Sequence, residues 1–169
     1  MDVLLVDGYN MIGAWPDLKV LKDKDLDQAR QLLVEKMAEY QAYRKRRVIV
    51  VFDAYEVRSV ENRYKQFKVE VIFTKENETA DQCIERLVKS IKNVKTKVFV
   101  ATSDYTEQRT IFAQGAFRVS ARELNIELKN IQKEINQDIK VHQQAKARSK
   151  IPLNDDVLQV FERWRRGEK

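Results

Sequence analysis

Four aspartates that are widely separated in the sequence each follow an apolar segment typical of a buried strand. Asp7 ends the segment VLLVD, Asp53 follows VIVVF and Asp104 follows VFVATS, while Asp81 closes the stretch TKENETAD that comes after VEVIF. In an open parallel sheet, ligands bind beside the carboxyl ends of the strands. If these segments form such a sheet, the four carboxylates meet at one edge.

Carboxylates gathered at one edge repel one another unless a cation neutralises them, and hard cations such as Mg²⁺ or Mn²⁺ prefer oxygen ligands. A divalent ion there activates a water molecule and offsets negative charge on a phosphate. Each aspartate taken singly also suits a turn or a helix N-terminus. The metal-site hypothesis therefore depends on all four occurring together.

Several polar neighbours complete this hypothesis. Asn10 is neutral and can reach back from the loop after the first strand to orient Asp7 or a ligand. Ser103 either orients Asp104 or contacts a phosphate, or it is a turn hydroxyl. Glu76 and Glu78 precede Asp81, and one of them is a candidate ligand for a second metal, although a solvated loop is the preferred position for Glu76.

The elements that position these residues follow from hydrophobic patterning. Strands are predicted at Val3–Val6, Val48–Phe52, Val69–Phe73 and Val98–Ala101, with a short fifth at Phe117–Val119. The alternation around Val69–Phe73 indicates an edge strand, whereas the continuous apolar runs indicate strands buried on both faces. Helical periodicity covers Leu26–Tyr43, Thr79–Ile91, Thr106–Gln114, a long helix opening at Ser120–Glu123 and a last helix around Asp155–Arg166. Thr79 and Gln82 form a capping box at the second of these helices. Strand–helix alternation predicts an α/β fold with a mostly parallel sheet.

Composition excludes several protein classes. The 169 residues fit one domain, residues 1–169, with 120–169 as a helical C-terminal part. Hydrophobic content of 43% and charged content of 34% indicate a soluble protein, and neither a membrane span nor a signal peptide is predicted. Cys83 and His142 are the single cysteine and the single histidine, which argues against a zinc site and a two-histidine nuclease and fits a reducing cytoplasm. The net charge of +6 favours a polyanionic partner.

The segments LLVDGYNMI, VVFDA, TKENETAD and VATSDYTEQ, in this order and spacing, resemble the NYN domains of the PIN-like nuclease superfamily, specifically the YacP-like group. The resemblance covers nearly the whole chain. It implies a three-layer PIN-like fold with a central sheet of four to five strands. It also implies a metal-dependent endoribonuclease in which Asp7, Asp81 and Asp104 hold Mg²⁺ or Mn²⁺, without a small-molecule cofactor. Asn10 matches the loop asparagine of the family and Asp53 follows the second strand as it does there. Cleavage of mRNA on the ribosome is a further implication.

Basic and aromatic residues near the acids are candidates for RNA contacts. Those expected at the acidic edge are Arg58, Arg63, Lys65 and Arg109 as phosphate ligands, and Tyr9, Tyr55 or Tyr105 as stacking platforms. The run Arg44–Arg47 precedes the second strand, so we place it at the opposite edge, as a solvated helix end. Trp164 either contacts RNA or packs the last helix on the core, and packing is the preferred interpretation.

Other families fit less well. Aspartyl phosphatases carry a second acid two residues after the first, where this chain has Tyr9. P-loop and dinucleotide folds need glycine-rich turns that four glycines do not supply. The remaining alternative is a non-catalytic RNA- or ribosome-binding module on a nuclease-like fold. Metal-dependent cleavage of RNA that is lost when Asp7 is changed would exclude this alternative.

Overall fold

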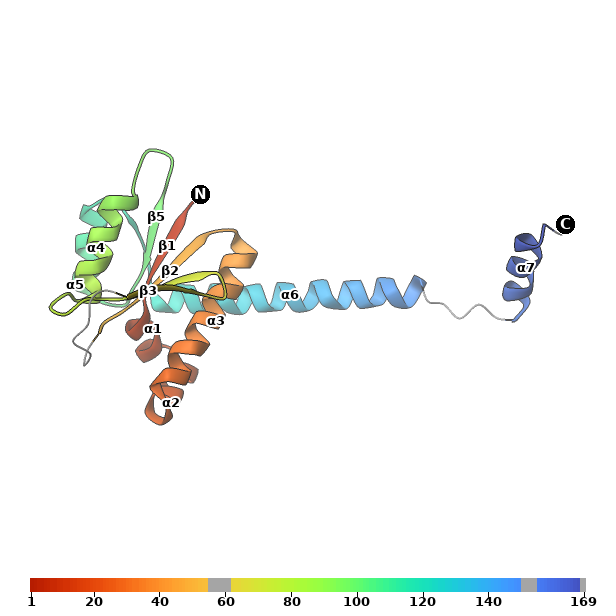
Figure 1. Cartoon of the computed structure of the whole chain (residues 1–169), viewed down its shortest axis with the longest axis horizontal. Coiled ribbons are helices and arrows are strands. Elements are labelled where there is room, and N and C mark those ends of the chain that lie inside the picture. The colour runs from red at the N-terminus through yellow and green to blue at the C-terminus, as the bar shows by residue number, and fades with distance from the viewer. Residues whose placement is uncertain (55–61, 150–154, 168–169) are drawn as a thin grey trace. The chain divides into compact units, whose positions relative to one another are not determined.

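The computed structural model describes residues 1–54, 62–149 and 155–167. The chain divides into two compact units, Met1–Ile131 and Gln132–Lys169. The first unit contains the sheet and the four aspartates, and it is shown with the rest of the chain in Figure 1.

The first unit is built on a six-stranded, mostly parallel sheet. Its strands are β1 (Val3–Asp7), β2 (Arg47–Phe52), β3 (Asn62–Gln66), β4 (Val69–Phe73), β5 (Val98–Ala101) and β6 (Phe117–Val119), in the order β3-β4-β2-β1-β5-β6. All neighbours pair in parallel except β3, which runs antiparallel to β4. β1 therefore lies in the middle of the sheet, between β2 and β5, where every one of its residues is buried.

The predicted α/β class, parallel pairing and helical C-terminal part are confirmed, but the expected number of strands is wrong. The structure has six strands because β3, with the polar sequence NRYKQ, pairs with β4 through its backbone. A strand without an apolar face gives no periodic signal. It also means that Val69–Phe73 is an interior strand rather than the edge.

Helices cover both faces of the sheet (Figure 1). The helices described along the whole chain are α1 (Gly8–Ala14), α2 (Pro16–Lys24), α3 (Leu26–Arg44), α4 (Ala80–Ile91), α5 (Tyr105–Ala113), α6 (Ala121–Ser149) and α7 (Asp155–Arg165). α4 and α5 pack on one face through Val3, Leu5, Ile49, Val51 and Val100. α1 to α3 lie on the other face, where the indole of Trp15 donates to the carbonyl of Ala121 at the start of α6.

The segment after Asp7 is a helix rather than the loop expected from the sequence. α1 begins at Gly8, directly after β1, and Asp7 is its N-cap. A Cβ atom on Gly8 would come within 2.2 Å of the Phe52 ring, which is fully buried. Glycine at this position thus allows α1 to start against the last residue of β2.

The described residues of the second unit are mainly helical. α6 continues to Ser149 and α7 follows at Asp155. Trp164 on α7 is 68% exposed within the described residues, and its packing on the core stays a prediction. Among the described residues, no helix combines the length and apolar character that a bilayer crossing requires.

Candidate active site

The four aspartates lie at the carboxyl edge of the sheet. Asp7 is the last residue of β1, Asp53 directly follows β2 and Asp104 comes three residues after the end of β5. Asp81 lies in the first turn of α4, which runs from the same edge. The topology therefore unites residues separated by almost a hundred positions, as the sequence predicts.

Asp7 is buried at the centre of this group. Its side chain caps α1 by accepting a hydrogen bond from the backbone N–H of Asn10, at 3.4 Å. Burial raises the pKa of Asp7 to about 7, an effect that the Asn10 N–H opposes and that the carboxylates of Asp81, Asp53 and Asp104 reinforce. Because all three other acids act on Asp7, its surroundings favour either a bound proton or a bound cation at neutral pH.

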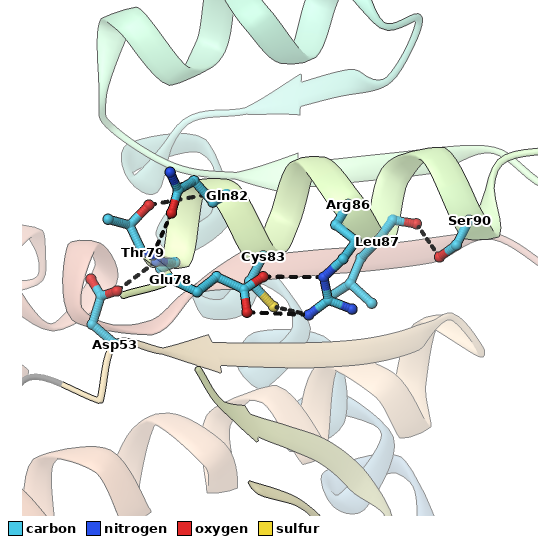
Figure 2. A network of polar contacts seen from close by, with 9 residues as sticks. Asp53, Glu78, Thr79, Gln82, Cys83, Arg86, Leu87 and Ser90 are labelled. Carbon is cyan, nitrogen blue, oxygen red and sulfur yellow. Dashed lines mark hydrogen bonds and ion pairs between the residues drawn. The ribbon is translucent and has the colours of Figure 1, made fainter. Parts of the chain in front are cut away.

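Asp53 links the end of β2 to α4. Figure 2 shows its carboxylate at the start of the helix, where it accepts a hydrogen bond from the backbone N–H of Ala80. Burial raises the pKa of Asp53, the Ala80 N–H lowers it and Asp81 raises it again. Thr79 and Gln82 complete the same helix end with the predicted capping box. Asp53 thus holds the helix that carries Asp81, in addition to placing its own charge at the edge.

Glu78 is engaged away from this group. Its side chain is 8% exposed and forms an ion pair of 3.1 Å with Arg86 in the second turn of α4 (Figure 2). Glu76 is exposed. Of the two glutamates considered for a second metal, Glu78 already has a cationic partner.

The segment carrying Asp104 is fixed by hydrogen bonds on several sides. The backbone N–H of Ser103 donates to the Asn10 side-chain oxygen, and the backbone N–H of Asp104 donates to the buried Thr102 hydroxyl at 3.1 Å. The Gln108 amide donates to the carbonyl of Thr102 at 2.8 Å. Asn10 therefore connects the ends of β1 and β5, and Ser103 contributes its backbone to that connection.

The donor set suits a divalent oxygen-seeking ion: four carboxylates, no cysteine or histidine at the edge, and one buried acid whose ionisation the others oppose. In the part of the chain that the structure describes, however, no three Asp, Glu, Cys or His side chains are gathered closely enough to hold a metal as they stand. The assignment of Asp7, Asp81 and Asp104 as metal ligands thus stays a prediction. It is supported by the chemistry of the carboxylates and by their position at one edge of the sheet.

The predicted RNA contacts are distributed unevenly. Arg109 is exposed on α5, near the acidic edge, whereas Arg58 and Tyr55 lie outside the described residues. Tyr9 is half-buried: its ring packs on Phe52 at 5.1 Å and its hydroxyl accepts a hydrogen bond from Arg30.

Two of the residues predicted to contact RNA lie on β3, at different distances from the acidic edge. Arg63 pairs with Ile72 toward the acidic edge, but Lys65 pairs with Glu70 toward the other edge. The expected position of Lys65 beside the acids is therefore wrong. The reason is the unpredicted antiparallel strand, which carries the chain back across the sheet.

The position predicted for Arg44–Arg47 at the far edge is confirmed, since α3 ends and β2 begins there. Arg44 pairs with Glu127 at 3.0 Å. Arg46 donates to the Tyr40 hydroxyl and lies over the Phe99 ring at 4.2 Å, and Arg47 bonds both carboxylate oxygens of Glu70. These arginines hold the fold together, which agrees with their exclusion from the site.

Sequence reasoning missed the polar residues that hold the edge in place. Arg30 has no local motif, but its position between Ala29 and Leu33 on the buried stripe of α3 is a usable signal for a partnered cation. Thr74 and Thr102 are fully buried, and the hydroxyl of Thr74 accepts the N–H of Ala54 beside Asp53. The partner of Thr74 is distant in sequence, so no spacing reveals it, whereas Thr102 accepts from Asp104 two residues further on.

Comparison with known proteins identifies this arrangement. The model of the YacP-like NYN domain matches residues 4–166. The chain belongs to the YacP-like NYN domain family. It is 55% identical over 168 residues to the protein YacP of Bacillus subtilis (strain 168), covering 99% of each chain. The YacP-like NYN resemblance and the nuclease-like fold expected from the motifs are thereby confirmed.

Solved structures of this family agree in fold. The crystal structure of Rae1 (YacP) from Bacillus subtilis superimposes with a TM-score of 0.76 at 55% identity, covering 99% of this chain and 96% of that one. A W164L variant of the same protein gives a TM-score of 0.76 at 53% identity, with the same coverage. Both similarities extend over the sheet and the C-terminal helices.

Proposed function

We propose that this YacP-like NYN domain is an endoribonuclease that hydrolyses a phosphodiester of mRNA with Mg²⁺ or Mn²⁺ held by Asp7, Asp81 and Asp104. The observation that carries the proposal is the burial of Asp7 among three other carboxylates, which raises its pKa to about 7. A structural role alone does not require four like charges at one edge, since such charges oppose one another.

The residues of the chain take distinct parts in this reaction. Asp7 is the central ligand because it is buried and fixed as the N-cap of α1. Asn10 positions the segment that carries Asp104, and Asp53 positions the helix that carries Asp81. When bound, a divalent cation supplies Lewis acidity that activates water and offsets charge on the phosphate. Asp7 must release its proton to become a ligand, so activity rises with pH toward neutrality.

The choice of mRNA as substrate and of the ribosome as partner rests on the YacP-like resemblance. The charge of the chain supports a polyanion in general, with 32 Lys and Arg against 26 Asp and Glu. A nuclease that acts on translated mRNA works in the cytoplasm, which also fits the single cysteine.

A second function is favoured by one observation. As the side chains stand, no three metal-ligating groups among the described residues are gathered closely enough for a metal. A non-catalytic RNA- or ribosome-binding module on a nuclease-like fold therefore remains the alternative. The two functions differ in one measurable property, the cleavage of RNA in the presence of a divalent ion.

The decisive experiment incubates the protein with naked mRNA and with translating ribosomes, each with Mg²⁺ and with EDTA. The proposal expects Mg²⁺-dependent cleavage in at least one setting, abolished in Asp7→Asn and retained in Asp23→Asn, which removes an exposed acid of α2. Binding without cleavage in both settings would establish the alternative.

A further inference from the structure

A hollow of about 540 Å³ on α5 and β6 carries aromatic and basic side chains that the proposed chemistry does not use. It is lined by Gln108, Arg109, Phe112, Phe117 and Arg118. Phe112 is 76% exposed and Phe117 is 49% exposed. Exposed apolar surface that is gathered in one place and rimmed by polar groups is typical of a binding site.

The hollow begins beside the acidic edge. Gln108 is anchored there, because its side chain donates to the Thr102 carbonyl and its backbone N–H donates to the Asp104 carbonyl. Residues three or four positions apart are neighbours on a helix surface, so Phe112 lies beside both Gln108 and Arg109. The rise from Gln108 to Phe112 is about 6 Å along the helix axis. The hollow therefore adjoins the segment that carries Asp104 at its Gln108 end.

One aromatic side chain is held in place before any ligand arrives. Phe117 pairs with Phe99 across the parallel strands, and their rings stack with centroids 5.1 Å apart and planes 27° from parallel. The guanidinium of Arg46 lies over the Phe99 ring. A pre-positioned ring loses little conformational entropy when a ligand binds, which favours binding.

The charge of the hollow is positive. Arg109 and Arg118 are exposed, and within the described ranges neither forms an ion pair. None of the described side chains that line the hollow is acidic. A positive groove with aromatic rings matches unpaired nucleic acid, whose bases stack on the rings while its phosphates contact the cations.

We propose that this hollow binds a single-stranded stretch of RNA adjoining the cleavage position, with bases stacked on Phe112 and Phe117 and phosphates held by Arg109 and Arg118. The inference rests on the proposed function for its choice of RNA, but its test does not require cleavage. It places the specificity for unpaired RNA on the α5–β6 side of the acids.

The test measures binding of a short unstructured RNA to the full chain in EDTA, by fluorescence anisotropy, with 2-aminopurine in the RNA as a stacking probe. Loss of one base–aromatic contact weakens binding by about fivefold or more. Phe112→Ala and Phe117→Ala should each weaken binding by this amount and reduce the stacking signal. Phe117→Leu keeps an apolar side chain against Phe99, so it controls for loss of folding. Arg109→Gln and Arg118→Gln should each flatten the salt dependence by about 0.7 in logarithmic slope.

Matched controls lie elsewhere on the first unit. Phe67→Ala removes a phenylalanine that is 59% exposed in the turn between β3 and β4, and Lys97→Gln removes an exposed cation next to β5 at its amino end. Both should bind RNA as the wild type does. Asp7→Asn should also bind RNA, so a failure of the nuclease proposal leaves this test intact.

Three results would overturn the inference. The first is wild-type binding in the Phe112 and Phe117 variants, and the second is no binding of naked RNA by the wild type. The third is loss of ribosome-dependent cleavage in these variants with unchanged binding of naked RNA, which would assign the hollow to a protein partner.

Discussion

The Asn10 side-chain oxygen accepts a hydrogen bond from the backbone N–H of Ser103, a residue 93 positions further along the chain. This bond joins the start of α1 to the segment that carries Asp104. It explains why an asparagine, rather than a further acid, stands three residues after Asp7: an amide oxygen accepts the bond without adding charge to four carboxylates.

Removing this link should lower activity without unfolding the protein. Asn10→Ala loses the acceptor, so Asp104 is less well positioned, and we expect slower cleavage with weaker activation by Mg²⁺. Asn10→Asp keeps an acceptor but adds a negative charge beside Asp7, which should shift the pH profile upward. The measurement is cleavage rate against Mg²⁺ concentration and pH. A wild-type profile for Asn10→Ala would show that the hydrogen bond has no positioning role.

Neutralising the buried acid should abolish cleavage and stabilise the metal-free fold. Asp7→Asn keeps an oxygen for the N-cap of α1 but cannot ionise. The pKa of Asp7 in the folded protein, about 7, lies above its ordinary value of about 3.9. Folding therefore favours the protonated form, and the wild type loses stability as pH rises from about 4 to 7, by up to about 4 kcal/mol.

Thermal unfolding between pH 4 and pH 8 in EDTA measures this effect. The wild type should lose more stability than Asp7→Asn over that range, and the variant should have the higher melting temperature at pH 8. Parallel curves for the two proteins would mean that Asp7 ionises freely in the folded state. Asp81→Asn and Asp104→Asn should also abolish cleavage with the fold intact.

A divalent ion should stabilise the protein in a pH-dependent way. Mg²⁺ or Mn²⁺ binds the ionised carboxylates, so the rise in melting temperature should be larger at pH 8 than at pH 5. EDTA should reverse the shift. The control is Asp7→Asn/Asp81→Asn at the same ionic strength, which should show no shift. An equal shift in this double variant would place the ion elsewhere.

The close approach of α1 to Phe52 predicts opposite effects of one substitution at two glycines. Gly8→Ala places a methyl group against the buried Phe52 ring, whose neighbours Tyr9 and Phe73 restrict its movement, and should cost about 1–3 kcal/mol. Gly13→Ala has no atom within 4 Å and lies in the same helix, so it should stabilise by about 0.5–1 kcal/mol. Denaturant unfolding compares the two. A neutral Gly8→Ala would show that the helix can shift away from the ring.

The basic surface at the far edge should not contribute to cleavage of a small RNA. Lys45, Lys65 and Lys68 line a hollow of about 330 Å³ there, next to Arg46 and Arg47. Changing the three lysines to alanine tests this surface without breaking the contacts of the arginines with Tyr40 and Glu70. Cleavage rate against salt is the readout. Loss of activity on a minimal RNA would move the substrate path to this edge, while loss confined to ribosomal substrate would indicate docking.

The predictable parts of the fold are those with a strong local signal. Continuous apolar runs such as VIVVF identify buried strands, and Thr79 with Gln82 identifies a helix start, because both depend on neighbouring residues. β3 escaped prediction since its pairing with β4 uses backbone groups that every sequence possesses. That omission alone misplaced Lys65.

The acidic residues of the site were predictable, but their supports were not. Strand polarity is enough to bring Asp7, Asp53 and Asp104 to one edge. The contacts of Asp53 with Ala80 and of Arg30 with Tyr9 depend on side-chain directions in the folded protein. The acids therefore follow from topology, and the hydrogen bonds that fix them follow from packing.

The position of β1 at the middle of the sheet has a consequence for biosynthesis. β1 is made first, but one of its neighbours, β5, ends at Ala101, and the segment that holds Asp104 is made later still. A nascent chain that does not yet include Asp104 has no complete acidic edge, even if its first part has already folded. If Asp7, Asp81 and Asp104 hold the metal as proposed, the site cannot form while the message is being translated up to that point. The proposed chemistry then requires that the segment carrying Asp104 has first left the exit tunnel.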